Sequence, residues 1–229
     1  MNIATLIRFG KGSYDGIWEG NRWFAHGNLV EIAQHYGIGM TVIATEADYE
    51  KVCACCDGLI IPGSPIDIDP TYYGADPFDP PNEVDEYALD SKVIAEFDKM
   101  RKPMFGICGG HQELNIYFGG TIKKIDNNEA HMHRSTKLHP ITITEGSFVH
   151  DVFGSTRAVV NCYHNWELGR LGDGLSAVAV TDDGVIEAIE NKELAIYATQ
   201  WHPEVYMDLD DHIERKFFDN FLKKCEEKR

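Results

Sequence analysis

The segment KPMFGICGGHQELNIYF, residues 102–118, decides the fold predicted for this chain. It opens with a short apolar run, typical of a buried strand, and ends with the period of a helix. Between the two lies G-x-C-x-G, the thiol version of the sharp strand-to-helix turn that carries a nucleophile. The segment therefore predicts an α/β fold with Cys108 at the carboxyl end of a strand.

Two glycines flank Cys108, each two residues away from it. A nucleophile on so tight a turn lies in a strained backbone region, where side chains two positions away would crowd it. Glycine at 106 and 110 removes that crowding. The positive N-terminal end of the following helix would lie beneath Cys108 and favour its thiolate. A buried cysteine in a glycine-rich turn is the structural alternative.

The second signal lies far along the chain, in QWHPE at residues 200–204. A reactive thiol needs a base, and the base needs a partner that orients it. Residues two apart on an extended chain point to the same side, so Glu204 can lie behind His202 and accept its second ring hydrogen. Pro203 holds His202 out of helical conformation. We therefore expect the other ring nitrogen of His202 to face the sulfur of Cys108.

The third signal is IPGS, residues 61–64, at the end of another apolar strand. In open parallel sheets the reactive crevice lies outside the carboxyl ends of the strands. Gly63 or Ser64 can supply one backbone N–H group there, and Gly109 can supply another. Together they would form the oxyanion hole that acyl transfer through a thioester requires. A simple turn after a strand is the alternative interpretation.

A long, turn-rich loop covers residues 64–82. Ordered loops of this length are often functional. Because this one leaves the turn at Gly63, we expect it to roof the pocket, with Tyr72, Tyr73 and Phe78 able to contact a leaving group. A packed surface loop is the alternative.

Short β-rich runs alternate with segments of helical period in the first half of the chain, as in βαβ units. After Gly120 the pattern changes to shorter strands over 121–201, separated by Gly- and Asp-rich turns. The chain closes with an amphipathic helix. The elements expected in the first half are strands at 2–8, 40–45, 57–63 and 103–107 and helices at 23–36, 46–56, 83–100 and about 109–118.

No internal repeat and no linker divides the sequence. We therefore predict one α/β domain over residues 1–229, with a central, mostly parallel sheet flanked by helices and a small antiparallel β arm. Its length suits one ordinary domain.

Composition excludes several classes of protein. The 37 acidic residues exceed the 21 basic ones and give a net charge of −16. Such a surface repels phosphate backbones and anionic lipids, so neither nucleic acid nor a membrane is an expected partner. No apolar run approaches the roughly 20 residues that span a bilayer, and the start lacks the features of a signal peptide. The six cysteines lie in apolar contexts, which favours a reduced, cytoplasmic chain.

Two groups of potential metal ligands have plainer interpretations. The run Cys53–Cys56 could be a metal or redox site, but small apolar residues at a helix end also pack against a sheet. His131, His133 and His139 lack a carboxylate or thiol partner at the spacing of zinc sites. We expect these histidines to be exposed or hydrogen-bonded and predict no metal site.

Three motifs closely resemble those of the class I glutamine amidotransferase-like superfamily: the IPGS turn at 61–64, G-x-C-x-G at 106–110 and W-H-P-E at 201–204. The resemblance extends over most of the chain. Within it, the γ-glutamyl-γ-aminobutyrate hydrolase branch is the most similar. The resemblance implies the flavodoxin-like fold of the class I amidotransferases. The segments that carry the likeness to the hydrolase branch are 65–74 with 85–86, 114–115 with 119–121, 160–164 and 183–190.

The resemblance also implies roles. Cys108 would be the nucleophile, His202 the general base and then the acid, and Glu204 its orienting partner. Gly63, with Ser64 beside it, and Gly109 would be the oxyanion donors. Near the α-amino and α-carboxylate groups of a glutamyl substrate it places Gln112, His164, Asn165 and Trp166.

Two positions depart from the hydrolase branch. The residue after the cysteine is often arginine there, but here it is Gly109, and the run Gly110-His111-Gln112 is more similar to the glutaminase subunits of synthases. The turn is Pro-Gly-Ser rather than Pro-Gly-Gly, so Ser64 brings a side chain to the second oxyanion position. Both departures concern the leaving group rather than the chemistry.

The sequence therefore predicts a cysteine-dependent hydrolase that cleaves the γ-glutamyl amide bond of a small conjugate through a thioester and releases glutamate and an amine. The alternative is a glutaminase subunit that delivers ammonia to a separate synthase. The G-H-Q run favours this alternative, and the 64–82 loop disfavours it. A non-enzymatic binding domain on the same fold is a third possibility. The chemistry requires no metal or organic cofactor, while the released amine, a homodimer and a synthase partner are left open.

Overall fold

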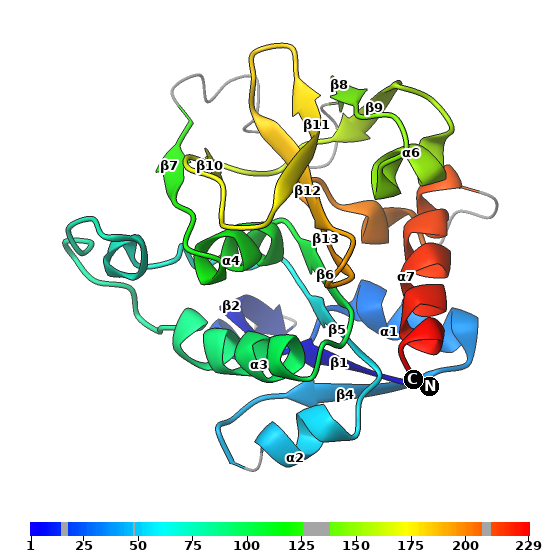
Figure 1. Ribbon diagram of the computed structural model, residues 1–229. Coiled ribbons are helices and arrows are strands. Elements are labelled where there is room, and N and C mark those ends of the chain that lie inside the picture. Colours follow the sequence, from blue (N-terminus) through cyan, green and yellow to red (C-terminus); the bar gives the residue numbers. More distant parts are fainter. Residues whose placement is uncertain (15–17, 48, 126–137, 208–211) are drawn as a thin grey trace.

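A single nine-stranded sheet forms the centre of the molecule in the computed structural model, which describes residues 1–14, 18–47, 49–125, 138–207 and 212–229 (Figure 1). Five neighbouring strands run parallel, and the remaining four continue the sheet in antiparallel pairs. The order across the sheet is β4 (Gly39–Ile43), β1 (Asn2–Leu6), β5 (Gly58–Ile61), β6 (Met104–Ile107), β13 (Ile196–Thr199), β12 (Ile186–Asn191), β11 (Ser176–Thr181), β8 (Leu138–Ile143) and β9 (Arg157–Asn161).

The parallel strands are apolar on both faces because helices cover both. Successive side chains of β5 point to opposite faces of the sheet. Ile60 packs in a cluster with residues of one helical layer, and Leu59 and Ile61 pack in a cluster with residues of the other. The first layer is α1 (Gly27–Tyr36) and α7 (Lys216–Glu227). The second layer is α2 (Tyr49–Ala54), α3 (Tyr87–Lys99) and α4 (Gly109–Tyr117) (Figure 1).

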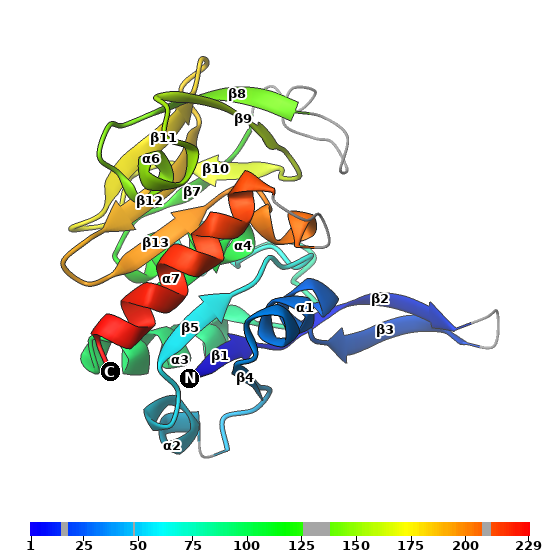
Figure 2. The same cartoon turned by 90° about the vertical axis from the view of Figure 1, so that its right-hand side faces the viewer.

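Smaller elements surround the antiparallel half of the sheet. They are α6 (Phe148–Phe153) and a two-stranded ribbon of β7 (Ile122–Lys124) and β10 (Trp166–Leu168). On the parallel side, β2 (Arg8–Tyr14) and β3 (Trp18–Phe24) form an antiparallel hairpin that extends away from the body (Figure 2). Three 3-10 helices are also described: η1 (Pro70–Tyr73), η2 (Pro203–Tyr206) and η3 (Ile213–Arg215).

The predicted fold class is confirmed, with differences at particular elements. The helix expected over 23–36 begins only at Gly27, because residues 18–24 pair with β2 instead. The Phe9 and Trp23 rings meet across the hairpin with 5.1 Å between their centroids, a cross-strand contact that outweighs local helical period. α6 and β10 were not predicted from sequence.

All six cysteines lie in the described residues and are thiols. Cys53 and Cys56 are buried in the cluster beneath α2 and α3, as the packing interpretation predicted, and Cys55 is exposed. Among the described residues no group of three or more His, Cys, Asp or Glu side chains has an arrangement that could hold a metal ion, and His131 and His133 lie outside those residues. No helix in the described ranges has the length and apolar character needed to cross a membrane.

Four adjacent parallel strands position the site. β1, β5, β6 and β13 end at the same edge of the sheet, and the residues that follow them are held close together. At or just beyond these four strand ends lie Arg8, Gly63, Cys108 and His202.

Candidate active site

Cys108 occupies the strained turn that the sequence predicted. Its backbone has φ 52° and ψ −102°, a combination that residues other than glycine rarely adopt. The Cys108 N–H donates to the carbonyl of Thr199 at 2.8 Å, which ties the turn to β13. A Cβ at Gly106 would lie 2.5 Å from the carbonyl oxygen of Gly110, so the glycine at 106 is required for the close approach.

Gly110 is packed still more tightly, and replacing it with alanine should destabilise the protein. A Cβ there would lie 2.3 Å from the carbonyl oxygen of Ile61, so β5 and α4 would have to move apart. We expect a loss of about 3 kcal/mol in the free energy of unfolding, measured by urea denaturation. Gly27→Ala is the matched control, because nothing lies within 4 Å of a Cβ at that position. Equal stability of the two variants would contradict the packing argument.

His202 and Glu204 meet as predicted. Nδ1 of His202 donates to Oε1 of Glu204 at 2.7 Å. The backbone route differs from the extended chain that was expected, because η2 begins at Pro203 and turns Glu204 back beneath the ring. Glu204 is buried.

The other side of the His202 ring faces the cysteine. A Cβ at Gly63 would lie 3.1 Å from Cε1 of His202 and 3.4 Å from Cβ of Cys108, so both side chains adjoin this glycine. Burial opposes charging of the imidazole, but the charges of Glu204 and Cys108 outweigh it and raise the pKa of His202 well above its usual value. The surroundings of His202 thus favour the charged form of its imidazole beside the sulfur of Cys108.

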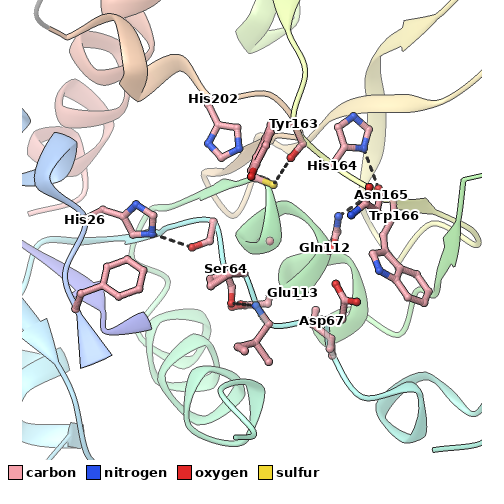
Figure 3. A pocket seen from close by; sticks show the side chains of 17 residues that line it. His26, Ser64, Asp67, Gln112, Glu113, Tyr163, His164, Asn165, Trp166 and His202 are labelled. Atoms are coloured by element: carbon pink, nitrogen blue, oxygen red, sulfur yellow. Dashed lines mark hydrogen bonds between the residues drawn. The ribbon is translucent and has the colours of Figure 1, made fainter. Parts of the chain in front are cut away.

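Two groups at the sulfur were missed by sequence reasoning. Nε2 of Gln200 donates to Sγ of Cys108 at 3.5 Å. The second group is the carbonyl oxygen of Tyr163, which lies 3.8 Å from Sγ, as Figure 3 shows. Gln200 is fully buried, and its Oε1 accepts from Nε2 of Gln112 at 3.1 Å and faces Nδ1 of His111 at 3.2 Å. The amide of Gln200 is therefore oriented toward the sulfur. Its position two residues before His202 was the available signal.

Asn161 holds the backbone of His202 from both sides. Its Nδ2 donates to the His202 carbonyl at 2.8 Å, and its Oδ1 accepts from the His202 N–H at 2.9 Å. This pair of bonds links β9, at the far edge of the sheet, to the turn after β13. The orientation of the histidine therefore depends on the antiparallel half of the sheet.

Gly63, Ser64 and Gly109 lie together beside Cys108, as the sequence predicted. The Ser64 side chain turns toward Glu86: its Oγ donates to Oε2 of Glu86 at 2.5 Å and accepts from the N–H of Ile66 at 2.9 Å. A Cβ at Gly109 would lie 2.9 Å from the backbone nitrogen of Ser64, so that nitrogen lies against the N-terminus of α4. This close approach requires a glycine at position 109 in place of a larger residue.

A cavity of about 750 Å³ opens beside the sulfur (Figure 3). Its wall includes the four residues that the sequence placed near the glutamyl group. Nε2 of Gln112 and Nδ1 of His164 both approach the carbonyl oxygen of Trp166, at 3.3 Å and 3.0 Å. The described residues that line the cavity are Phe24, His26, the segment 63–68, Cys108, Gly109, Gln112, Glu113, the segment 163–166 and His202.

A buried ionic network lies behind His164. Oε1 of Glu187 is 3.4 Å from Nε2 of His164 and 3.5 Å from Nε2 of His139. Although burial acts in the opposite direction, the two imidazoles lower the pKa of Glu187 to about 2. The same histidines overcome burial to lower the pKa of Cys162 to about 6. The network fixes the side chain of His164 and, through it, the wall formed by Trp166.

Only the first part of the 64–82 loop lines the cavity, through residues 64–68. Tyr72 instead donates to Oδ2 of Asp85 at 2.6 Å and meets the edge of Tyr87, and Tyr73 lies in η1. The Phe78 ring packs against Trp166 from outside, with 6.1 Å between centroids. The expectation that Tyr72, Tyr73 and Phe78 reach the pocket directly is therefore wrong, because their rings are used in packing the loop.

The chain is similar to known proteins over most of its length. The model of the family described as Peptidase C26 matches residues 14–204. A Lactococcus lactis protein, provisionally named glutamine amidotransferase-like protein YvdE, is 31% identical over 202 residues, which cover 80% of this chain and 82% of that protein. Gamma-glutamyl-gamma-aminobutyrate hydrolase PuuD of Escherichia coli K12 is 27% identical over 198 residues, which cover 77% and 75%.

Other matches concern synthases and the fold. GMP synthase of Dictyostelium discoideum is 31% identical over 134 residues, which cover 58% of this chain and 18% of the synthase. A crystal structure from Thermoplasma acidophilum, of a protein provisionally described as one of the subunits of GMP synthase, superposes with a TM-score of 0.67 at 22% identity. It covers 99% of this chain and 94% of that one. This likeness supports the fold alone.

Proposed function

Since this chain belongs to the peptidase C26 family, we propose that it hydrolyses the γ-glutamyl amide bond of small conjugates of glutamate with an amine or amino acid. The resemblance that the motifs predicted is confirmed at the family level. The observation that carries the proposal is Cys108, which lines the cavity in a strained turn beside an imidazole that Glu204 orients. The same three groups would perform acyl transfer.

In the first half-reaction, His202 takes the proton of the Cys108 thiol, and the sulfur attacks the side-chain carbonyl of the glutamyl group and forms a C–S bond. The carbonyl oxygen becomes an oxyanion, stabilised by the backbone N–H groups of Gly63 or Ser64 and of Gly109. His202 gives its proton to the amine nitrogen as the C–N bond breaks. A γ-glutamyl thioester and a free amine result.

In the second half-reaction, water replaces the amine. His202 takes a proton from the water, whose oxygen attacks the thioester carbonyl. The C–S bond then breaks to release glutamate, and the proton returns from His202 to the sulfur. Glu204 keeps the imidazole in the tautomer that each step needs. No step requires a metal or an organic cofactor.

The glutamyl end of the substrate would lie against Gln112 and the segment 164–166. Asp67 brings a carboxyl group to this wall, which can accept a hydrogen bond from an α-ammonium group. Both His164 and Gln112 are held by the Trp166 carbonyl, so the wall is formed before substrate arrives.

A panel of amides tests the proposal. Purified protein is incubated with glutamine and with γ-glutamyl conjugates of γ-aminobutyrate, a polyamine and an amino acid, and released glutamate is measured. We expect turnover of at least one conjugate bulkier than glutamine, and a mass increase of one glutamyl group on Cys108 during turnover. An α-glutamyl amide is the negative control. The proposal would be overturned if none of the γ-glutamyl amides released glutamate.

A second candidate is a glutaminase subunit that passes ammonia to a separate synthase. The partial match to GMP synthase favours it, together with the run Gly110-His111-Gln112. The same panel distinguishes the two, because steady hydrolysis of bulky amides without a partner belongs to the first candidate. The cytoplasmic location and the possible homodimer stay predictions.

A further inference from the structure

Arg8 is a fully buried cation at the first residue of β2, just beyond the end of β1 and next to the turn after β5. No sequence motif singled it out. Its guanidinium lies among the carboxylates of Glu86, Asp90 and Glu113, all three of which are buried. Burial opposes its charge, but these carboxylates outweigh that effect and raise the pKa of Arg8. Arg8 is therefore a permanent positive charge inside the protein.

The guanidinium also holds two backbone carbonyls of the turn. Nη2 and Nε of Arg8 donate to the carbonyl oxygen of Pro62 at 2.9 Å and 3.3 Å, and Nε donates to the carbonyl oxygen of Gly63 at 3.2 Å. Nε2 of His26 lies 3.0 Å from the same Gly63 oxygen. The two carbonyls thus have partners on the side of the turn that Arg8 occupies.

These carbonyls belong to the peptide units whose N–H groups matter for the reaction. A peptide unit is planar and trans, so its C=O and N–H point in opposite directions. The carbonyl of Pro62 shares a plane with the N–H of Gly63, and the carbonyl of Gly63 shares one with the N–H of Ser64. Holding both carbonyls against Arg8 consequently fixes the directions of both N–H groups, with the nitrogen of Ser64 toward Gly109.

We propose that Arg8 is a positioning residue that orients and polarises the oxyanion-hole peptides of Gly63 and Ser64. The proposal rests on the proposed function, since it assigns a role within the same acyl transfer. Arg8 acts through the backbone and does not touch the substrate: it is absent from the described residues that line the cavity. The carboxylates hold the guanidinium in place, and Glu86 links them to the turn through the Ser64 hydroxyl.

The test is Arg8→Lys, which keeps the charge but lacks the planar fork that reaches two carbonyls and the carboxylates together. We expect kcat for a γ-glutamyl amide to fall about 100-fold, the size of effect seen when one oxyanion donor is lost, with KM changed less than about 3-fold. A γ-glutamyl aldehyde adds to the sulfur as a hemithioacetal, whose oxygen takes the place of the oxyanion, and its binding should weaken by a similar factor. Alkylation of Cys108 by iodoacetamide, which forms no oxyanion, should keep its wild-type rate.

Two further variants separate an effect on catalysis from a loss of folding. Arg8→Met combined with Asp90→Asn removes the cation and one buried carboxylate together, and it should show the same fall in kcat if the lysine variant does not fold. Val149→Ala in α6 removes core volume away from the cavity, and it should lower thermal stability with kcat unchanged.

The outcomes separate this inference from the proposed function. If wild-type protein releases glutamate and a folded Arg8 variant keeps wild-type kcat and aldehyde affinity, the role of Arg8 is refuted and the proposed function stands. An equal loss of kcat and of alkylation rate would also refute it, because the change would then lie in the thiol. If wild-type protein cleaves no γ-glutamyl amide, the proposed function fails first.

Discussion

Alanine in place of Cys108 is expected to lower kcat for γ-glutamyl amides by about 10⁴-fold or more. The thioester route needs a sulfur nucleophile, and no other thiol lies at the cavity wall in the part of the chain that the structure describes. Removal of the nucleophile from a triad leaves only the catalysis supplied by binding and by the oxyanion hole. The measurement is the release of glutamate under single-turnover and steady-state conditions.

The matched control for this prediction is Cys55→Ala. Cys55 is an exposed thiol after α2, away from the cavity, so its loss should leave kcat within about 2-fold of wild type. The Cys108 variant should also fail to gain the glutamyl mass and should still bind substrate, because the cavity wall is otherwise unchanged. Turnover by the Cys108 variant at the wild-type rate would exclude a thioester mechanism.

Sequence could predict the elbow because its constraints are local. The close approach at Gly110 and the positive φ of Cys108 impose a spacing that is visible in five consecutive residues. The pairing of His202 with Glu204 is also local, since the two residues lie in one turn. The meeting of these segments followed from the rule that parallel strands present their carboxyl ends at one edge.

The site residues that the sequence did not reveal make contacts with residues far away along the chain. Arg8 belongs to no motif, and Asn161 and Gln200 lie in quoted segments that assigned them no role. Each becomes a site residue only through contacts with distant parts of the chain. Their burial is the feature that distinguishes them, and burial of a single polar residue is not visible in a sequence. The hairpin of β2 and β3 was missed for a related reason, because cross-strand contacts decide its conformation.

The two departures from the hydrolase branch are connected in three dimensions. The serine at position 64 directs its hydroxyl to Glu86, so its side chain leaves the oxyanion position free. Its backbone nitrogen approaches position 109 so closely that a side chain there would force a shift. Gly109 and Ser64 are therefore best understood as one local solution, in which the turn lies against the N-terminus of α4.

Glu204→Gln should lower kcat/KM by about 10⁴-fold while leaving the fold intact. The amide can present its N–H₂ group to Nδ1 of His202, which stabilises the wrong tautomer of the imidazole. Glu204 is also one of the two charges that hold the pKa of His202 well above its usual value, so this pKa falls in the variant. The basic limb of the pH profile of kcat/KM should accordingly move to lower pH.

The free energy of unfolding provides an independent test of the Glu204→Gln substitution. Because the folded-state pKa of His202 is raised, its contribution to stability is fully present below about pH 6.5 and is lost as pH rises through the folded-state pKa. The difference in unfolding free energy between wild type and Glu204→Gln should therefore shrink as pH rises through that range.

Glu190→Gln is the matched control for the pH profile of activity. Glu190 is a buried glutamate on β12 that accepts from the N–H of Phe148 at 2.8 Å, and its substitution should leave that profile in place. If Glu204→Gln kept the wild-type basic limb, the carboxylate would not be acting through the imidazole, and His202 would need another partner to serve as the base.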